Sequence, residues 1–422
     1  MNQVIAKRIE TLRRGEVPKG YVSENHQIRP MDWPYGKIGE YLTAYDEFSN
    51  DTEKYPLATS SRQGLMLQSE YYSDQRYEET SGGFHVVPEG YVTYRHMSDD
   101  DIFRFNVNRM GTPVLVSPEY PVFTTRDGLN QELLIAYLNN MKEFTAYCSA
   151  QKKGSTRTRM YFSRLGEFKM PIPPLAEQQK IAEILSTCDR VIELKQQLLD
   201  EKRKQKQWLM QILLDPDSGV RLPGFEGSQW HRKSIDELAE IYSGGTPNTE
   251  NEAYWNGDIP WCVPSDITSA GKYISCTETT ITDLGLHKSS AVILPVGAIL
   301  MCSRATIGPR SIAKIPIATN QGFKSFVCKS DVNNEFLYYA IETVLPELLK
   351  KAAGNTFKEI SKSDVAKTVL NVPSLHEQEA IATCLTHADT EIDLLEQELE
   401  AWQQKKKALM QLLLTGLVRV NA

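Results

Sequence analysis

Two stretches of this chain decide its architecture, and they lie 200 residues apart. Residues 173–214 read PPLAEQQKIAEILSTCDRVIELKQQLLDEKRKQKQWLMQILL, and residues 373–414 read PSLHEQEAIATCLTHADTEIDLLEQELEAWQQKKKALMQLLL. Aligned without a gap, the two stretches share 18 of 42 residues. So long an ungapped match makes chance a poor explanation, and we interpret the chain as one unit of about 200 residues used twice.

Apolar residues recur in both stretches at alternating spacings of three and four, which predicts one long α-helix in each. Forty residues at the standard rise would give a helix roughly 60 Å long. The residues that we expect to form a seam between the two helices are Leu185, Ile192, Leu199, Leu209, Leu385, Ile392, Leu399 and Leu409. The alternative is that the helices are unrelated and that each covers its own domain. Mutual pairing is favoured because both seams continue through several turns and match in length.

The two predicted helices carry recognisable ends. Ser374 and Glu377 have the spacing of a capping box at the start of the second helix. Asp215-Pro216 ends the first helix, because proline has no backbone N–H to donate, and Gly416 follows the second.

The segments outside the helices predict two mixed α/β domains. Both are rich in short runs of Val, Ile, Tyr and Thr that are broken by Gly and Pro. Residues that correspond near the two domain starts are Trp33 and Trp230, Ile38 and Ile235, and Glu40 and Glu237. We therefore predict an α/β (α+β) fold with a duplicated order: domain 1–172, helix 173–214, Pro/Gly-rich linker 215–229, domain 230–372, and helix with tail 373–422.

Composition excludes several classes of protein. The 422 residues carry 47 Lys+Arg and 54 Asp+Glu, with 41% hydrophobic residues, which is ordinary for a globular chain and unlike a disordered or fibrous one. No apolar stretch is long enough to span a bilayer and the first residues lack a signal-peptide core, so we expect a cytoplasmic protein without membrane contact. Seven scattered cysteines without a C-x-x-C pair indicate neither a disulfide framework nor a zinc site.

Basic residues are clustered, although the net charge of the chain is −7. Between positions 152 and 169, six basic residues accompany one acid, Glu167, and between 284 and 330 six basic residues occur without any acid. A phosphate backbone requires such clusters, but a merely solvated basic face has the same composition. One cluster in each half favours nucleic acid, because duplicated DNA-reading domains recognise duplicated half-sites. Much of the acid excess lies in 373–400, with eight acidic residues and no Lys or Arg.

Three polar motifs of the second domain are less decisive. Ser243-Gly-Gly-Thr-Pro247 suits a tight turn better than a phosphate-binding loop. Trp255 and Trp261 are interpreted as core and loop anchors rather than as base-stacking platforms. The amides of Asn320 and Gln321 can pair with adenine, or they can hold loops together.

Sequence signatures of catalysis are absent. There is no G-x-x-x-x-G-K-[ST] loop for nucleotide phosphates, no Asn-Pro-Pro-Tyr of amino-methyltransferases and no H-E-x-x-H. No spacing of histidines suits a metal ion. We therefore expect a protein that is not an enzyme by itself and that holds no metal.

The repeated motif carries a resemblance to a known family. Two copies of P-x-L-x-E-Q-x-x-I-A-x-x-L, each ending in Leu-Met-Gln-x-Leu-Leu, resemble the helical regions of type I restriction-modification specificity subunits. The linker Arg221-Leu-Pro-Gly-Phe-Glu226 and the C-terminal Leu-Thr-Gly-Leu-Val-Arg419 are similar to that family too. So is the second-domain stretch from Ser243 to Arg304-Ala-Thr-Ile-Gly308, which includes Ile259-Pro-Trp261.

The resemblance implies a function and a set of partners. Two target recognition domains would each read one half of a bipartite double-stranded DNA sequence, and the two helices would pair antiparallel, with pseudo-two-fold symmetry, to fix the gap between the halves. The helices would dock two methyltransferase subunits, and restriction (translocase-nuclease) subunits would join them. S-adenosylmethionine, ATP and Mg would then be bound only by the partner subunits. The first domain lacks the Gly-Thr-Pro and Ile-Pro-Trp elements, so we expect the two half-sites to differ.

Local charge then selects candidate DNA contacts. We predict that Arg157, Arg159, Arg304 and Arg310 contribute to recognition and that Lys152, Lys153, Lys314 and Lys324 contact phosphates, with Asn320 and Gln321 as further candidates. Two other functions stay open at this point. The chain would otherwise be a non-catalytic coiled-coil scaffold whose α/β domains bind proteins rather than DNA, or a self-contained modification enzyme with a divergent site.

Overall fold

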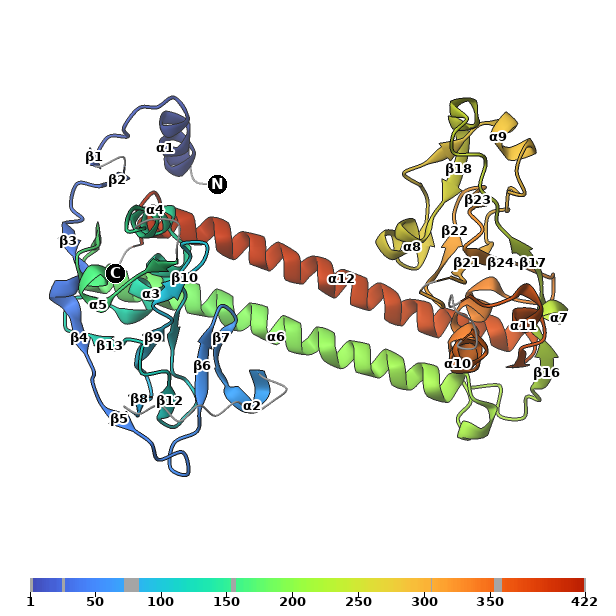
Figure 1. Ribbon diagram of the computed structural model, residues 1–422, viewed down its shortest axis with the longest axis horizontal. Helices are drawn as coiled ribbons and strands as arrows, with labels where there is room; N and C mark the ends of the chain where they lie inside the picture. The colour runs from blue at the N-terminus through green and yellow to red at the C-terminus, as the bar shows by residue number, and fades with distance from the viewer. Residues whose placement is uncertain are drawn as a thin grey trace. The chain divides into compact units, whose positions relative to one another are not determined.

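The structure is a computed structural model that describes residues 3–24, 27–71, 83–152, 157–304, 306–352 and 359–420. The chain forms two compact units. Unit 1 is Met1–Lys195 with Glu398–Ala422, and unit 2 is Gln196–Gln397. The two long helices are α6 (Leu175–Leu213) and α12 (Leu375–Leu414), and each unit contains part of both (Figure 1).

Unit 1 is a mixed α/β assembly of short elements. Its shorter helices are α1 (Gln3–Arg13), α2 (Gln68–Tyr71), α3 (Gln131–Asn140), α4 (Lys142–Ala150) and α5 (Phe162–Gly166). Its strands are β1 (Tyr21–Glu24), β2 (Gln27–Pro30), β3 (Tyr35–Lys37), β4 (Leu42–Ala44), β5 (Phe48–Ser49), β6 (Ala58–Ser61), β7 (Gly64–Leu67), β8 (Phe84–Val87), β9 (Val92–Tyr94), β10 (Met97–Ser98), β11 (Phe105–Val107), β12 (Val114–Val116), β13 (Val122–Thr125), β14 (Thr158–Arg159) and β15 (Lys169–Pro171).

The centre of unit 1 is a four-stranded sheet in the order β11-β9-β13-β4, accompanied by a three-stranded sheet β12-β8-β5. β-branched and aromatic residues dominate these strands, which suits a pleated surface that is buried. Helix α3 begins at Asn130, whose side chain accepts a hydrogen bond from the backbone N–H of Leu133. The core extends into both long helices, because Ile181 of α6 and Leu413 of α12 belong to it.

Unit 2 repeats the class of fold with different strands. Its shorter helices are α7 (Ile235–Leu238), α8 (Pro264–Ala270), α9 (Asp283–His287), α10 (Asn334–Ala352) and α11 (Lys362–Ala366). Its strands are β16 (His231–Ser234), β17 (Ala239–Ser243), β18 (Trp255–Cys262), β19 (Tyr273–Ile274), β20 (Thr280–Ile281), β21 (Ile299–Cys302), β22 (Arg310–Ala313), β23 (Ala318–Thr319), β24 (Phe323–Cys328) and β25 (Val369–Val372).

A five-stranded sheet, β17-β24-β21-β22-β19, forms the centre of unit 2, and a second sheet has the order β20-β18-β23. Helix α10 packs on the sheet, with Phe336, Leu337 and Ile341 in the core. Near the start of each domain a strand pairs antiparallel with the strand that leads into a long helix, β3 with β15 and β16 with β25. The corresponding Ile38 and Ile235 follow these strands, and each is fully buried.

The two long helices lie side by side and antiparallel within each unit (Figure 1). In unit 1, Asp189 of α6 pairs with Lys406 of α12, and Lys195 lies 2.5 Å from Glu398. In unit 2, the ion pairs are Lys202 with Glu391, Arg203 with Glu396 and Lys206 with Asp389. Residue numbers rise on one helix as they fall on the other, so mutual antiparallel pairing is favoured over two unrelated helices.

The residues predicted to form the seam differ in burial. Leu185, Leu199, Leu385, Ile392 and Leu399 are buried, and Ile192, Leu209 and Leu409 are half-buried. The predicted mixed α/β class with two long paired helices is thus confirmed.

The ends of the helices agree with the sequence in all but one detail. Helix α6 ends before Asp215-Pro216, and Gly416 after α12 has a φ of 70°, the left-handed conformation that favours glycine. Ser374 caps α12 through the backbone N–H of Glu377. The other half of the predicted capping box is wrong, because the Glu377 carboxylate instead accepts hydrogen bonds from Ser228 and Trp230. No described helix combines the length and apolar character that a membrane crossing needs.

Candidate nucleic-acid interface

In unit 1, arginines gather at one end of the central sheet. Arg95 directly follows β9 and Arg104 directly precedes β11, and the antiparallel register that pairs Tyr94 with Phe105 brings both arginines to the same end. Arg159 in β14 lies opposite Met97 in β10. The tip of the β6–β7 hairpin adds Arg62.

A cleft of about 380 Å³ opens at this end of unit 1. Its walls carry Arg62, Arg95 and Arg104, and its polar lining includes Ser60 and Ser98, both of which are buried. The cleft therefore combines guanidinium groups with buried hydroxyl groups, and this combination suits phosphate oxygens and guanine edges. We call Arg62, Arg95, Arg104, Arg157 and Arg159 the arginine cluster.

Three consecutive aspartates neutralise only part of this charge. Asp99 lies 2.7 Å from Arg157, Asp100 lies 2.5 Å from Arg62, and Asp101 lies 3.7 Å from Lys152. The hydrogen bond from Arg62 lowers the pKa of Asp100, and the Thr158 hydroxyl lowers that of Asp101, so both stay ionised.

Arg95, Arg104 and Arg159 are exposed and make no ion pair within the described part of unit 1. Of the residues predicted from sequence, Arg157 and Arg159 lie in the arginine cluster. Lys152 is held by Asp101. Lys153 lies outside the described residues. Arg62, Arg95 and Arg104 were missed, because they are scattered along the chain and only strand pairing brings them together.

In unit 2, the predicted polar residues meet where three strands of the central sheet end. Cys302 of β21 pairs with Phe323 of β24, and Ser243 of β17 pairs with Lys324, so the adjoining loops share one end of the sheet. These loops hold Arg304, Thr246, Asn320 and Gln321, which we call the unit 2 loop cluster.

The glycines of the Ser243–Pro247 motif allow this end to close tightly. A Cβ on Gly244 would lie 1.9 Å from the backbone oxygen of Asn320. Gly245 donates its N–H to the Thr319 oxygen at 2.9 Å, and Trp261 donates its ring N–H to the Gly245 oxygen at 2.9 Å. The motif therefore packs as an irregular loop against the Thr319–Asn320 loop, and the predicted tight turn is wrong, because the turn begins only at Thr249. Trp261 anchors the motif, as the sequence favoured.

The loop cluster keeps hydrogen-bond donors for a partner. Arg304 places its Nε 2.8 Å from Glu359, and among the described residues its two terminal nitrogens make no hydrogen bond. The side-chain oxygen of Asn320 accepts from Gly322 at 2.8 Å and that of Gln321 accepts from Thr246. Both amide oxygens therefore accept a hydrogen bond, while the NH₂ groups bond to no described residue and can donate to acceptors on a base edge.

Lys324 belongs to the same end but lies below its surface. The residue is 5% exposed, and its Nζ lies 3.4 Å from Ser303 Oγ and 3.7 Å from Glu359. Burial lowers the pKa of this ammonium, and Glu359 opposes that effect. A phosphate contact by Lys324 would require the side chain to leave this position.

Arg310 begins β22 opposite Met301, at the same end of the sheet, and Lys314 follows the other end of that strand. All three nitrogens of Arg310 are engaged within unit 2, with the Tyr338 oxygen at 2.7 Å, the Gly308 oxygen at 3.0 Å and Glu342 at 2.8 Å. Lys314 is exposed, and its ammonium lies 3.9 Å from the centre of the Tyr273 ring. Their predicted role in DNA recognition stays a prediction, for which Arg310 would have to exchange partners that it already has.

The Glu-Gln pair of the repeated motif holds each domain to its helix. Glu177 is buried and accepts from Trp33 at 3.1 Å and from Arg419, whose guanidinium lies over the Trp33 ring. In unit 2, Glu377 accepts from Trp230 at 3.2 Å. The tryptophans that correspond in the two domains therefore serve the same junction.

The glutamines of the motif bind the start of a domain helix. Gln178 Oε1 accepts from the backbone N–H of Asn130 at 2.7 Å, and Gln378 Oε1 accepts from that of Asn333 at 2.9 Å. Asn130 and Asn333 in turn cap α3 and α10. The repetition of Glu-Gln thus reflects a structural junction, a role that the sequence alone did not assign.

A metal centre in either unit would need a set of His, Cys, Asp or Glu side chains arranged around the ion. In the part of the chain that the structure describes, no group of three or more His, Cys, Asp or Glu side chains is arranged to hold a metal ion. The seven cysteines are free thiols, and of these Cys276 is exposed.

Two regions of the chain match a known protein family. Residues 82–201 and 227–402 match the family model of the type I restriction modification DNA specificity domain. The chain is 39% identical over 186 residues to the type I restriction enzyme MjaIX specificity subunit of Methanocaldococcus jannaschii, a match that covers 43% of this chain and 42% of that relative. It is 25% identical over 436 residues to a putative MjaX specificity subunit of the same organism, covering 98% and 97% of the two chains.

Solved structures share the fold. The S subunit of a type I restriction-modification system from M. genitalium matches with a TM-score of 0.56 at 15% identity, covering 90% of this chain and 96% of that chain. A chain from a study of assembly and conformational transition in the type I R-M system matches with a TM-score of 0.54 at 17% identity, covering 92% and 99%.

Proposed function

Because this chain belongs to the type I restriction-modification DNA specificity family and is the non-catalytic specificity subunit of such a system, we propose that each unit reads one half of a bipartite double-stranded DNA target. The observation that carries this proposal is that each unit gathers, at one end of its central sheet, side chains with donor nitrogens that bond to no described residue. These donors are Arg95, Arg104 and Arg159 in unit 1, and Arg304, Asn320 and Gln321 in unit 2.

The two ends differ in chemistry, so the half-sites would differ too. Unit 1 presents three arginines that pair with no described acid, and arginine forks suit guanine O6 and N7 as well as phosphates. Unit 2 presents one arginine fork with two amide NH₂ groups, which suits a half-site with a mixture of purine acceptors. Lys152 and Lys314 are exposed and would contact phosphates nearby.

We assign the gap between the half-sites to the long helices. The interhelical ion pairs and the buried leucine seam fix the antiparallel register of α6 and α12 within each unit. A helix changes length only in steps of 1.5 Å per residue, so a paired helix rod suits the function of a spacer.

The same helices would dock two methyltransferase subunits. Apolar side chains that avoid the seam recur at the same places in both copies: Leu175 and Leu375 are 47% and 37% exposed, and Leu194 and Leu394 are 47% and 56% exposed. Apolar groups that stay exposed at repeated positions are expected where one kind of partner binds twice. Restriction subunits would join this core, and S-adenosylmethionine, ATP and Mg would be bound by the partners.

Half-site mutants test the DNA assignment. The assembled methyltransferase is titrated with its own target and with targets in which one half is scrambled. An R95A/R104A double variant should lose about 1–3 kcal/mol per arginine on the intact target and should no longer distinguish the scrambled first half. An R304A variant should do the same for the other half. R109A is a matched control, because Arg109 follows β11 at its opposite end and pairs with Glu132.

A stoichiometry experiment tests the docking assignment. The number of methyltransferase subunits per chain is measured by native mass spectrometry for L194E, L394E and the double variant. We expect two methyltransferase subunits per chain for the wild type, one for each single variant and none for the double variant. Two subunits on the double variant would contradict this docking surface while leaving the DNA assignment intact.

A further inference from the structure

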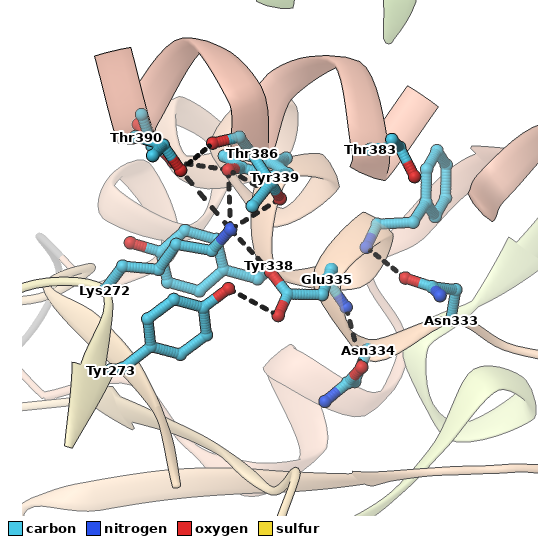
Figure 2. Close-up of polar contacts among 12 residues, drawn as sticks. Lys272, Tyr273, Asn333, Asn334, Glu335, Tyr338, Tyr339, Thr383, Thr386 and Thr390 are labelled. Atoms are coloured by element: carbon cyan, nitrogen blue, oxygen red, sulfur yellow. Dashed lines mark hydrogen bonds and ion pairs between the residues drawn. The ribbon is translucent and has the colours of Figure 1, made fainter. Parts of the chain in front are cut away.

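A partly buried lysine joins the second recognition domain to the helix pair in unit 2. Lys272 lies in the turn between α8 and β19, and its side chain is 11% exposed. Its Nζ lies 2.5 Å from Glu335 Oε2 and donates to the hydroxyls of Tyr339 and Thr386, each at 2.8 Å. Figure 2 shows the Lys272 side chain at the centre of these contacts, which we call the Lys272 hub.

The hub connects three elements that are far apart in the sequence. Glu335 and Tyr339 come from α10, and Thr386 comes from α12. The backbone oxygen of Lys272 accepts from the N–H of Ile312 at 2.8 Å, which ties the hub to strand β22 of the central sheet. One residue thus joins the sheet, through its backbone, to the main domain helix and a spacer helix, through its side chain.

A shared carboxylate extends the hub to the other spacer helix. Asp389 of α12 accepts a hydrogen bond from the Tyr339 hydroxyl and pairs with Lys206 of α6. Lys272 Nζ lies 3.9 Å from the same carboxylate. Tyr273 donates its hydroxyl to Glu335 at 2.7 Å, so the acid that faces Lys272 is itself held in place (Figure 2).

Unit 1 has the corresponding helix pair but not the hub. Asp189 occupies the repeat position of Asp389, and its described partner is Lys406. Ala136 stands six residues after Asn130, as Tyr339 stands six residues after Asn333, so the hydroxyl that links domain to helix is missing there. Among the residues that the structure describes, only the second domain is attached to its helices in this way.

Polar contacts of this kind restrict geometry more than an apolar contact of equal area. Hydrogen bonds at 2.8 Å weaken steeply with distance and angle, whereas apolar surfaces tolerate sliding. A buried charge network is a weak source of net stability, and selection of one geometry is its better-attested role. The hub is therefore suited to orienting the domain.

We propose that Lys272 is a positioning residue that holds the second recognition domain in one orientation on the helix pair and thereby narrows the range of gap lengths accepted between the DNA half-sites. This inference rests on the proposed function of the helices as a spacer. It assigns to Lys272 the orientation of the domain, and no contact with DNA or with a partner subunit.

The test measures gap selectivity on the assembled methyltransferase. Its bipartite target, identified by methylation-sensitive sequencing, is made with the natural gap and with gaps one and two base pairs shorter or longer. For K272M, the preference for the natural gap over its neighbours should fall about three- to tenfold, while discrimination against a scrambled half-site is kept. K272R should restore most of the preference, because guanidinium can replace ammonium in the ion pair.

Two further variants distinguish a positioning role of Lys272 from a general loss of stability. Y339F removes only the hydroxyl shared by Lys272 and Asp389, and it should relax gap selectivity in the same direction without loss of folding. K233M is the matched control, because Lys233 pairs with Asp331 elsewhere in the same domain. Equal loss of affinity for all gaps in K272M and Y339F would overturn the inference. A wild-type protein without any gap preference would instead overturn the spacer assignment on which it rests.

Discussion

Glu177 accepts two hydrogen bonds of 2.8 Å from the guanidinium of Arg419, which stands 242 positions further along the chain. Arg419 also reaches Asp32 with two bonds of 2.9 Å. The C-terminal tail therefore completes unit 1 by joining the start of α6 to the beginning of the chain. In unit 2 the corresponding arginine lies further from its glutamate, with Arg221 Nε 3.9 Å from Glu377.

Removal of Arg419 should destabilise unit 1 selectively. R419A leaves the buried Glu177 carboxylate with fewer donors, and we expect a loss of about 2–4 kcal/mol in the free energy of unfolding. Hydrogen exchange of amides in unit 1 and unit 2 separates the local effects within the full chain. R221A is the matched variant and should cost unit 2 less. An equal cost of the two substitutions would contradict the role of the tail.

The sequence predicted the helices better than the site, for a physical reason. Heptad spacing fixes which face of a helix is apolar, so the seam through Leu199 and Leu399 was evident without coordinates. Counting charges along the chain says nothing about the direction of a side chain. Lys324 lies in β24, whose first four residues are all buried, and its charge is hidden although the segment is basic.

The sequence also did not predict which distant residues strand pairing brings together. Arg95 and Arg104 meet because β9 and β11 pair, and Arg62 joins them from a separate hairpin. The role of Glu177 was hidden for the same reason, since its partners Trp33 and Arg419 lie near opposite ends of the chain. Both features depend on register and chain closure, which periodicity does not encode.

Lys324 gives a pH-dependent prediction. Burial lowers its pKa in the folded state below the unfolded value of about 10.4, so between these two pKa values the unfolded chain binds more protons. The free energy of unfolding of the wild type should therefore rise with pH across this window relative to K324M. Urea unfolding of both proteins at pH 7.5 and 9.5 measures the difference, and a fall with pH would contradict it.

The same variant tests the predicted phosphate contact. With its ammonium buried beside Glu359, Lys324 should contribute little to DNA affinity, and K324M should leave the slope of log affinity against log salt unchanged. A phosphate contact would instead lower the magnitude of that slope by about one. K314M is the comparison, because Lys314 is exposed and is proposed to contact a phosphate. A smaller slope of log affinity against log salt for K324M would show that Lys324 does contact a phosphate.

Gly244 should be a sensitive position in the loops that hold the unit 2 loop cluster. A methyl group there would lie 1.9 Å from the Asn320 oxygen and 2.3 Å from the Thr319 oxygen, so the two loops would have to separate. We expect G244A to cost about 1–3 kcal/mol of stability, as overpacking does, and to lose discrimination of the second half-site while the first is still read. G227A is the matched control, because nothing lies within 4 Å of its added methyl group. If G244A read both half-sites like the wild type, the close packing of these loops would have no part in recognition, and Arg304, Asn320 and Gln321 would have to act without it.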